Sequence, residues 1–234
     1  MKLLTEDLAN FKMAKNRLKG RFLTYILHLA PSDISGYNTC KHASTGCKTA
    51  CLNTAGRGRF DNVKQARTRK TRLFFENRQQ FFDLLVKDLH AVERKAKKLG
   101  LRPVVRLNGT SDLPWDLIKV PGQSTCIFNL FPDIQFYDYT KDIAKVERLH
   151  VASIPNYHLT FSRSESNDTD CDRALALGVN VAVVFNSVPE VYNNLPVMSG
   201  DETDLRFLDA PRRIIGLTAK GDAKKDCSGF VVKI

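Results

Sequence analysis

Three of the six cysteines in this 234-residue chain fall within twelve consecutive positions. Cys40, Cys47 and Cys51 are separated by six and then by three residues, in the segment NTCKHASTGCKTACLNTAGRGRF (38–60). Thiolates bind soft and borderline metals, and three of them from one loop can surround a single centre. The residues between them are mostly polar, which is not typical of a buried core segment. We therefore predict that these three cysteines bind a metal centre.

The spacing alone leaves the identity of the metal open. Three ligands without an obvious fourth favour a [4Fe-4S] cluster in which one iron stays open. Zinc needs a fourth ligand, and His42 could supply it. The other cysteines, Cys126, Cys171 and Cys227, lie on separate predicted elements, where a buried or incidental thiol is the simpler interpretation.

Small polar residues follow two of the apolar segments. The segment RLNGTSDLPW (106–115) contains Asn108, Ser111 and Asp112, and TFSRSES (160–166) contains Ser162 and Arg163. Such side chains can hydrogen-bond a ligand, and we predict these five as cofactor-binding residues. The alternatives are turn and helix-cap chemistry for the first segment and a surface ion pair for the second.

Carboxylates suggest a further possibility. The segment MSGDETDLRFLD (198–209) is acidic, but its spacing does not match an EF-hand loop, so we expect a turn that forms salt bridges with the basic body. A metal-dependent nuclease would instead need Asp112, Asp138 and Asp201 to converge in space.

Apolar and helical segments alternate along the chain. Strands are predicted over residues 21–31, 102–109, 134–140, 157–164, 180–186 and 212–221, with a short terminal strand in 228–234. Helical spacing covers residues 3–18, 61–99, 141–150 and 168–178, and residues 125–131 favour a short helix.

This alternation predicts one α/β domain over residues 1–234 with a mostly parallel sheet, either an open doubly wound sheet or a partial barrel. Ligands of such folds bind at the carboxyl ends of the strands. The cysteine loop (38–56) follows the first long strand, so we expect it at that edge.

The composition constrains location and partners. The formal net charge of +11 and a basic cluster in residues 55–72 favour a polyanionic partner, a nucleic acid or a nucleotide, although a solvated helix face would account for some of these residues. No apolar run is long enough to cross a bilayer, and the N-terminal segment lacks an apolar signal core. We expect a cytoplasmic protein without membrane association.

Several motifs together resemble a known family. YILHLAP, CLNTAGRGRF, RLNGTSD, FYDYTK and VMSGDETDLRFLD, which are spread over most of the chain, resemble the phage family called gene product 88. The order of strand, three-cysteine loop, helix and five further strand–helix units also resembles the radical S-adenosylmethionine (SAM) architecture. The cysteines of that superfamily are usually spaced C-x3-C-x2-C, against C-x6-C-x3-C here.

The second resemblance implies a fold and a chemistry. The fold would be a partial (β/α)6 TIM-like barrel, with Cys40, Cys47 and Cys51 binding a [4Fe-4S] cluster whose open iron chelates SAM. Asn108, Ser111 and Asp112, and then Ser162 and Arg163, would contact SAM. We therefore expect a phage iron–sulfur protein of radical SAM type that acts on nucleic acid or a nucleotide, in the host cytoplasm. The alternatives are a zinc-stabilised, non-enzymatic nucleic-acid-binding phage protein and the metal-dependent nuclease.

Overall fold

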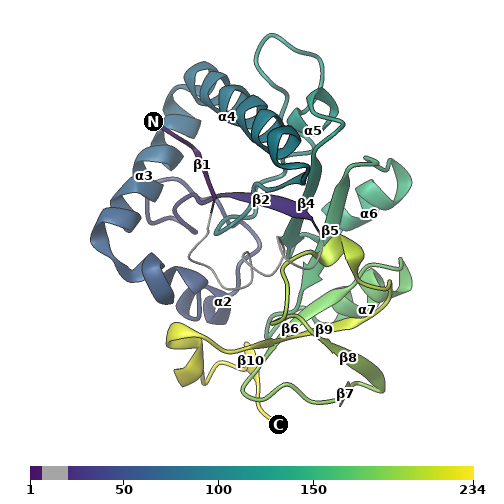
Figure 1. Ribbon diagram of the computed structural model, residues 1–234. Helices are drawn as coiled ribbons and strands as arrows, with labels where there is room; N and C mark the ends of the chain where they lie inside the picture. Colours follow the sequence, from purple (N-terminus) through teal and green to yellow (C-terminus); the bar gives the residue numbers. More distant parts are fainter. Residues whose placement is uncertain (7–20) are drawn as a thin grey trace.

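A ten-stranded sheet runs through the computed structural model, which describes residues 1–6 and 21–234 (Figure 1). The strands are β1 (Leu4–Thr5), β2 (Phe22–Leu27), β3 (Arg102–Arg106), β4 (Gln135–Thr140), β5 (Tyr157–Ser162), β6 (Val181–Phe185), β7 (Val191–Tyr192), β8 (Leu195–Ser199), β9 (Ile214–Thr218) and β10 (Val231–Val232). Their order is β1-β2-β3-β4-β5-β6-β9-β8-β7, and β10 pairs with β6.

The six predicted strands are neighbours in chain order and all run parallel, from β2 through β3, β4, β5 and β6 to β9. Strands such as FLTYIL and VAVVF are buried along most of their length, as expected for a parallel sheet covered on both faces. The prediction of an α/β fold with mostly parallel strands is therefore confirmed. The sequential order also differs from a doubly wound sheet, in which the strand order reverses.

The sheet does not close, and a TIM-like barrel is not confirmed. Closure would bring β2 beside β9, but β1 pairs with the free side of β2 and β8 pairs with the free side of β9. The hairpin β7–β8 was not predicted from the sequence. Its turn residues Asn193 and Asn194 have φ angles of 48° and 60°, a left-handed conformation that asparagine tolerates and that tight hairpins need.

Helices pack against different groups of strands in the sheet. They are α2 (Thr45–Thr49), α3 (Asp61–Glu76), α4 (Arg78–Leu99), α5 (Ile127–Leu130), α6 (Ile143–Val151) and α7 (Asp168–Ala176). Short 3₁₀ turns are η1 (Leu52–Thr54), η2 (Gly56–Arg59), η3 (Arg206–Leu208) and η4 (Gly221–Lys225). In Figure 1, α4 packs beside β2 and β3, whereas α6 and α7 lie beside β5 and β6.

Two helical predictions need correction. The segment 61–99 forms two helices, because Asn77 leaves helical geometry (φ −140°, ψ 78°) and its side chain accepts a hydrogen bond from the amide of Gln80, capping α4. Of the helix predicted over 3–18, Leu4–Thr5 forms β1, which extends the sheet antiparallel to β2. Residues 7–18 of that prediction lie outside the described residues.

Two large apolar clusters fill the protein. The first surrounds the buried Trp115, which packs against Phe74, Phe81 and Phe82. The second lies around Phe185, under α6 and α7. Tyr157 at the start of β5 packs against both clusters. None of the helices in the described ranges is long and apolar enough to cross a membrane.

Candidate functional site

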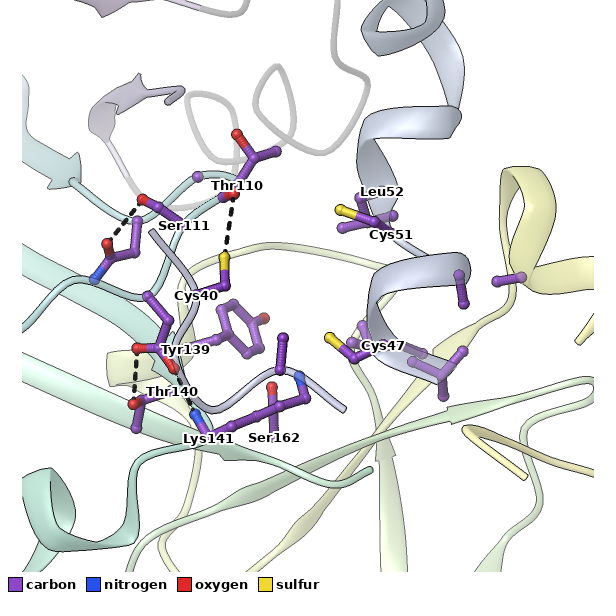
Figure 2. Close-up of a pocket in the computed structure, with 18 of the residues that line it drawn as sticks. Cys40, Cys47, Cys51, Leu52, Thr110, Ser111, Tyr139, Thr140, Lys141 and Ser162 are labelled. Atoms are coloured by element: carbon purple, nitrogen blue, oxygen red, sulfur yellow. Dashed lines mark hydrogen bonds between the residues drawn. The ribbon is translucent and has the colours of Figure 1, made fainter. Parts of the chain in front are cut away.

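A cavity of about 250 Å³ opens at the carboxyl ends of the parallel strands (Figure 2). Cys40, Cys47 and Cys51 all line it. Residues at or just after the ends of β3, β4, β5 and β9 form the opposite wall. The structure therefore brings the predicted thiols and the predicted sheet edge together in one place.

Each cysteine is positioned by a different piece of local structure. Cys40 follows a loop after β2, where the amide of Ser32 donates to its sulfur at 3.4 Å and the thiol faces the carbonyl oxygen of Thr110 at 3.9 Å. Cys47 lies on α2, and its amide donates to the capping hydroxyl of Ser44 at 3.1 Å. Cys51 directly precedes η1. Figure 2 shows the sulfur atoms of Cys47 and Cys51 turned toward the space that separates them from Cys40.

Glu165 attaches the cysteine loop to the sheet. It follows β5, and its carboxylate accepts hydrogen bonds from the Ser44 hydroxyl and the Gly46 amide, both at 2.7 Å. A Cβ atom at Gly46 would lie 2.2 Å from the Ser228 hydroxyl oxygen and 2.8 Å from the Glu165 carboxylate. Only glycine allows the start of α2 to pack this closely against Glu165 and the C-terminal segment.

Burial and the proximity of other cysteines raise the pKa of two of the three thiols, Cys40 and Cys51. Lys141 acts in the opposite direction and lowers the pKa of Cys51. A cation bound between the sulfurs would favour the thiolate forms, because a bound metal deprotonates a coordinating thiol.

Across the described residues, no three His, Cys, Asp or Glu side chains converge closely enough to bind a single metal ion. The proposed fourth zinc ligand, His42, does not line the cavity. Its imidazole is half exposed and lies 3.8 Å from the Asp142 carboxylate. The structure therefore does not bring His42 to the three cysteines.

Four of the five predicted cofactor-binding residues line the cavity: Asn108, Ser111, Asp112 and Ser162. The side chain of Asn108 forms hydrogen bonds within its own turn, since its amide oxygen Oδ1 accepts from Ser111, Leu113 and Trp115. This result matches the turn alternative, so Asn108 shapes the wall of the cavity.

Asp112 and Arg163 also make internal contacts. Asp112 accepts from the hydroxyl of Thr140 and the amide of Lys141, at 2.9 and 2.8 Å. Arg163 is not among the cavity residues; it donates to Asp168 and to the carbonyl oxygens of Gly229 and Phe230. Arg163 therefore forms an ion pair, as the alternative interpretation of this segment expected. It also holds the C-terminal segment against β5.

The three carboxylates of the nuclease alternative do not form one group. Asp138 is buried behind the cavity wall, where it accepts from the amide of Asn108 at 2.6 Å, while Asp112 and Asp201 line the cavity. Asp201 pairs with Lys220 at 2.9 Å. The acidic segment thus forms salt bridges with the basic body, as predicted, because Asp204 also pairs with Arg106. Asp209 pairs with Arg206 inside the segment itself.

Sequence reasoning missed part of the cavity wall. Arg106 and Tyr139 line the cavity and contact each other, with the guanidinium 4.6 Å from the ring centroid, and both contact Asp204. Both lie inside motifs quoted for the family resemblance, but neither residue type nor spacing marked them as cavity residues. Lys141, which directly follows β4, lies in the wall 5.5 Å from the ring of Phe230. Among the described residues it forms no ion pair with a carboxylate.

The remaining cysteines match the simpler interpretation. Cys126 and Cys171 are buried and Cys227 is exposed, and none of the three lines the cavity.

Fold and site together define an α/β protein with an open, mostly parallel sheet and a three-cysteine cavity at the carboxyl ends of its strands. The chain belongs to the gene product 88 family, whose family model matches residues 2–233. The expected membership of this phage family is therefore confirmed, whereas the radical SAM architecture finds no support in the comparisons. No curated protein and no protein of solved structure matches the chain.

Proposed function

We propose that this protein is an iron–sulfur protein in which Cys40, Cys47 and Cys51 bind a [4Fe-4S] cluster inside the cavity. The observation that carries the proposal is that all three thiols line one cavity at the edge of the sheet where α/β proteins bind ligands. Three cysteines that were merely separate buried core residues would have no reason to line the same cavity at this edge.

The arrangement of the ligands supports a cluster more than a single ion. A tetrahedral zinc site needs every donor within about 2.3 Å of one atom, and the described side chains do not converge in that way. A cluster has several metal atoms, so its cysteine ligands need not meet at one point. The cavity also has room for such a group beside the sulfurs.

The remaining wall is suited to a small polar ligand beside the cluster. Ser162, Thr218 and the backbone around Gly109 are polar groups on the wall that faces the cysteines. Lys141 adds a cation that would balance the negative charge of three thiolates or of an anionic ligand group. When bound, a cluster with an open iron supplies one-electron transfer to a ligand at that iron.

SAM is the ligand that we propose to test first. Its amino and carboxylate groups could chelate an open iron, and its remaining polar groups need donors such as Ser162. The parallel strands follow one another in chain order, as in a (β/α)6 unit, but the sheet is open, so the choice of SAM depends on the three cysteines and the polar groups near them. The enzymatic reaction would then be of radical SAM type.

Anaerobic purification followed by iron, sulfide and zinc analysis tests the proposal. The native chain should contain about four iron and four sulfide per chain and show broad visible absorption. Cys47→Ala should lose both. Cys171→Ala removes a buried thiol that lies outside the cavity, and it should keep them. Zinc, or no metal, in the native chain would overturn the proposal.

Binding of SAM is a separate question for the cluster-containing protein. Adding SAM should change the electron paramagnetic resonance spectrum of the reduced cluster, because the ligand would occupy the open iron. An unchanged spectrum at saturating SAM would exclude SAM as the ligand while leaving the cluster in place.

A further inference from the structure

A second surface beside the cavity mouth has features that the proposed cluster does not use. Neighbouring short elements there, α2, η2 and η4, carry five cations, which we call the cationic rim: Lys48, Arg57, Arg59, Lys224 and Lys225. All five side chains are exposed. Within the described ranges none of them pairs with a carboxylate. Acidic residues also lie on these segments: Asp222 and Asp226 at η4, and Asp61 at the start of α3.

Contacts between the short elements hold the rim together. The amide of Asp222 donates to the hydroxyl of Thr54 at 3.3 Å, which joins η4 to η1. A Cβ atom at Gly58 would lie 2.7 Å from the carbonyl oxygen of Asn53, so η2 packs directly on η1. Ala50 and Ala223 share one apolar cluster beneath them. In Figure 1 the yellow turn near the C-terminal end lies next to α2, consistent with these contacts.

Two apolar side chains are exposed on the same short elements, Leu52 on η1 and Phe60 directly after η2. Leu52 is 56% exposed and also lines the cavity, so it marks the mouth. Phe60 is 50% exposed, and the guanidinium of Arg59 lies 5.7 Å from its ring centroid. Phe60 occupies the N-cap of α3, where Ser, Thr, Asp or Asn is usual, and its side chain makes no cap hydrogen bond. Neither core packing nor helix capping therefore explains why a phenylalanine occupies this position.

We propose that this surface binds single-stranded nucleic acid. Phosphates would contact the cationic rim, a base would stack on Phe60, and the strand would pass the cavity mouth at Leu52. Exposed aromatic rings combined with unpaired cations are the means by which proteins bind single strands, because every base offers a face for stacking. A duplex keeps its bases stacked on each other and could use only the charges. The inference rests on the surface alone and does not depend on the metal.

Fluorescence anisotropy with a labelled single-stranded DNA of mixed sequence tests the proposal. The double variant Arg57→Glu/Arg59→Glu should weaken binding about tenfold or more at moderate salt. Lys87→Glu/Arg94→Glu, on an exposed part of α4, changes the net charge by the same amount and should weaken binding less than about threefold. Equal losses in the two double variants would show attraction to net charge alone and overturn the proposal.

Phe60→Ala separates stacking from charge. It should weaken binding about fivefold or more while leaving the salt dependence unchanged, because no phosphate contact is removed. Circular dichroism of each variant must match that of the native chain, so that loss of fold is excluded. Unchanged affinity of Phe60→Ala, or tighter binding of the same sequence as a duplex, would contradict single-strand recognition.

Discussion

Asp138 shows how a polar residue at the sheet edge can serve the fold. Its carboxylate is buried and accepts hydrogen bonds from the amide of Asn108 and the hydroxyl of Tyr157. Burial raises its pKa to about 6, although Lys145 opposes this effect. The unfolded chain releases this proton near the ordinary value of about 4. Between about pH 4 and 6 the folded protein therefore holds a proton that the unfolded chain has lost.

The stability contribution of Asp138 consequently falls as the pH rises through this window. It is fully present below the unfolded pKa and is lost above the folded pKa. The quantity to compare is the free energy of unfolding of the native chain minus that of Asp138→Asn. We predict that this difference is roughly 1–3 kcal/mol larger at about pH 4.5 than at about pH 7.5. Urea unfolding at both pH values measures it.

The control for Asp138 is Asp133→Asn, which removes an exposed carboxylate. It should change the free energy of unfolding by less than about 0.5 kcal/mol at either pH. A pH-independent difference between the native chain and Asp138→Asn would contradict the raised pKa.

Gly46 is the residue whose size decides where the cysteine loop lies. We predict that Gly46→Ala lowers the free energy of unfolding by about 1–3 kcal/mol, because the new methyl group meets Ser228, Glu165 and Phe230 within 2.8 Å. It should also increase the rate at which Cys47 is alkylated, since α2 is pushed off the sheet. Thiol titration and thermal unfolding measure the two effects. Thr49→Ala, on the exposed side of the same helix, should change neither.

At the scale of elements, the junction of α3 and α4 determines how the helical layer covers the sheet. Asn77 ends one helix and caps the next, accepting a hydrogen bond from the amide of Gln80 at 3.0 Å. We predict that Asn77→Ala lowers the free energy of unfolding by about 0.5–2 kcal/mol, because that amide loses its partner. Asn77→Asp retains an acceptor and should stay near the native value. Equal stability of the alanine variant in urea unfolding would show that the cap contributes nothing.

At the scale of the whole molecule, the continuous sheet joins the two apolar clusters. β4 and β5 pair over five residues at the point where one cluster meets the other. Phe185→Ala would leave a cavity in the second cluster. We predict that it lowers the free energy of unfolding by about 3–5 kcal/mol, as measured by the fluorescence of Trp115 in the first cluster. Trp115 is the single tryptophan of the chain, so its fluorescence reports on that cluster alone.

This experiment also tests the prediction of a single domain. If the fluorescence transition of Phe185→Ala stayed at the native midpoint while far-ultraviolet circular dichroism shifted, the two halves would unfold separately. Coincident transitions would establish one cooperative unit.

Local patterns in the sequence determined most of the fold and the presence of the thiol site. Apolar runs bounded by turn residues identified the six parallel strands, because strands buried on both faces leave a continuous apolar signal. The clustered cysteines needed no tertiary information to be recognised, since polar residues between thiols are a local feature. The short strands β1 and β7 carry too few residues to produce such a signal.

Only the tertiary structure decided which side chains meet. Arg106, Tyr139 and Asp204 lie far apart in sequence and share one wall because their strands and loops end at the same edge. Asn108 and Arg163 were both predicted as cofactor-binding residues, yet the side chains of both form hydrogen bonds within the protein. Edge pairing by β1 and β8 likewise kept the sheet open. Such contacts depend on the path of the whole backbone, and sequence spacing carries no information about them.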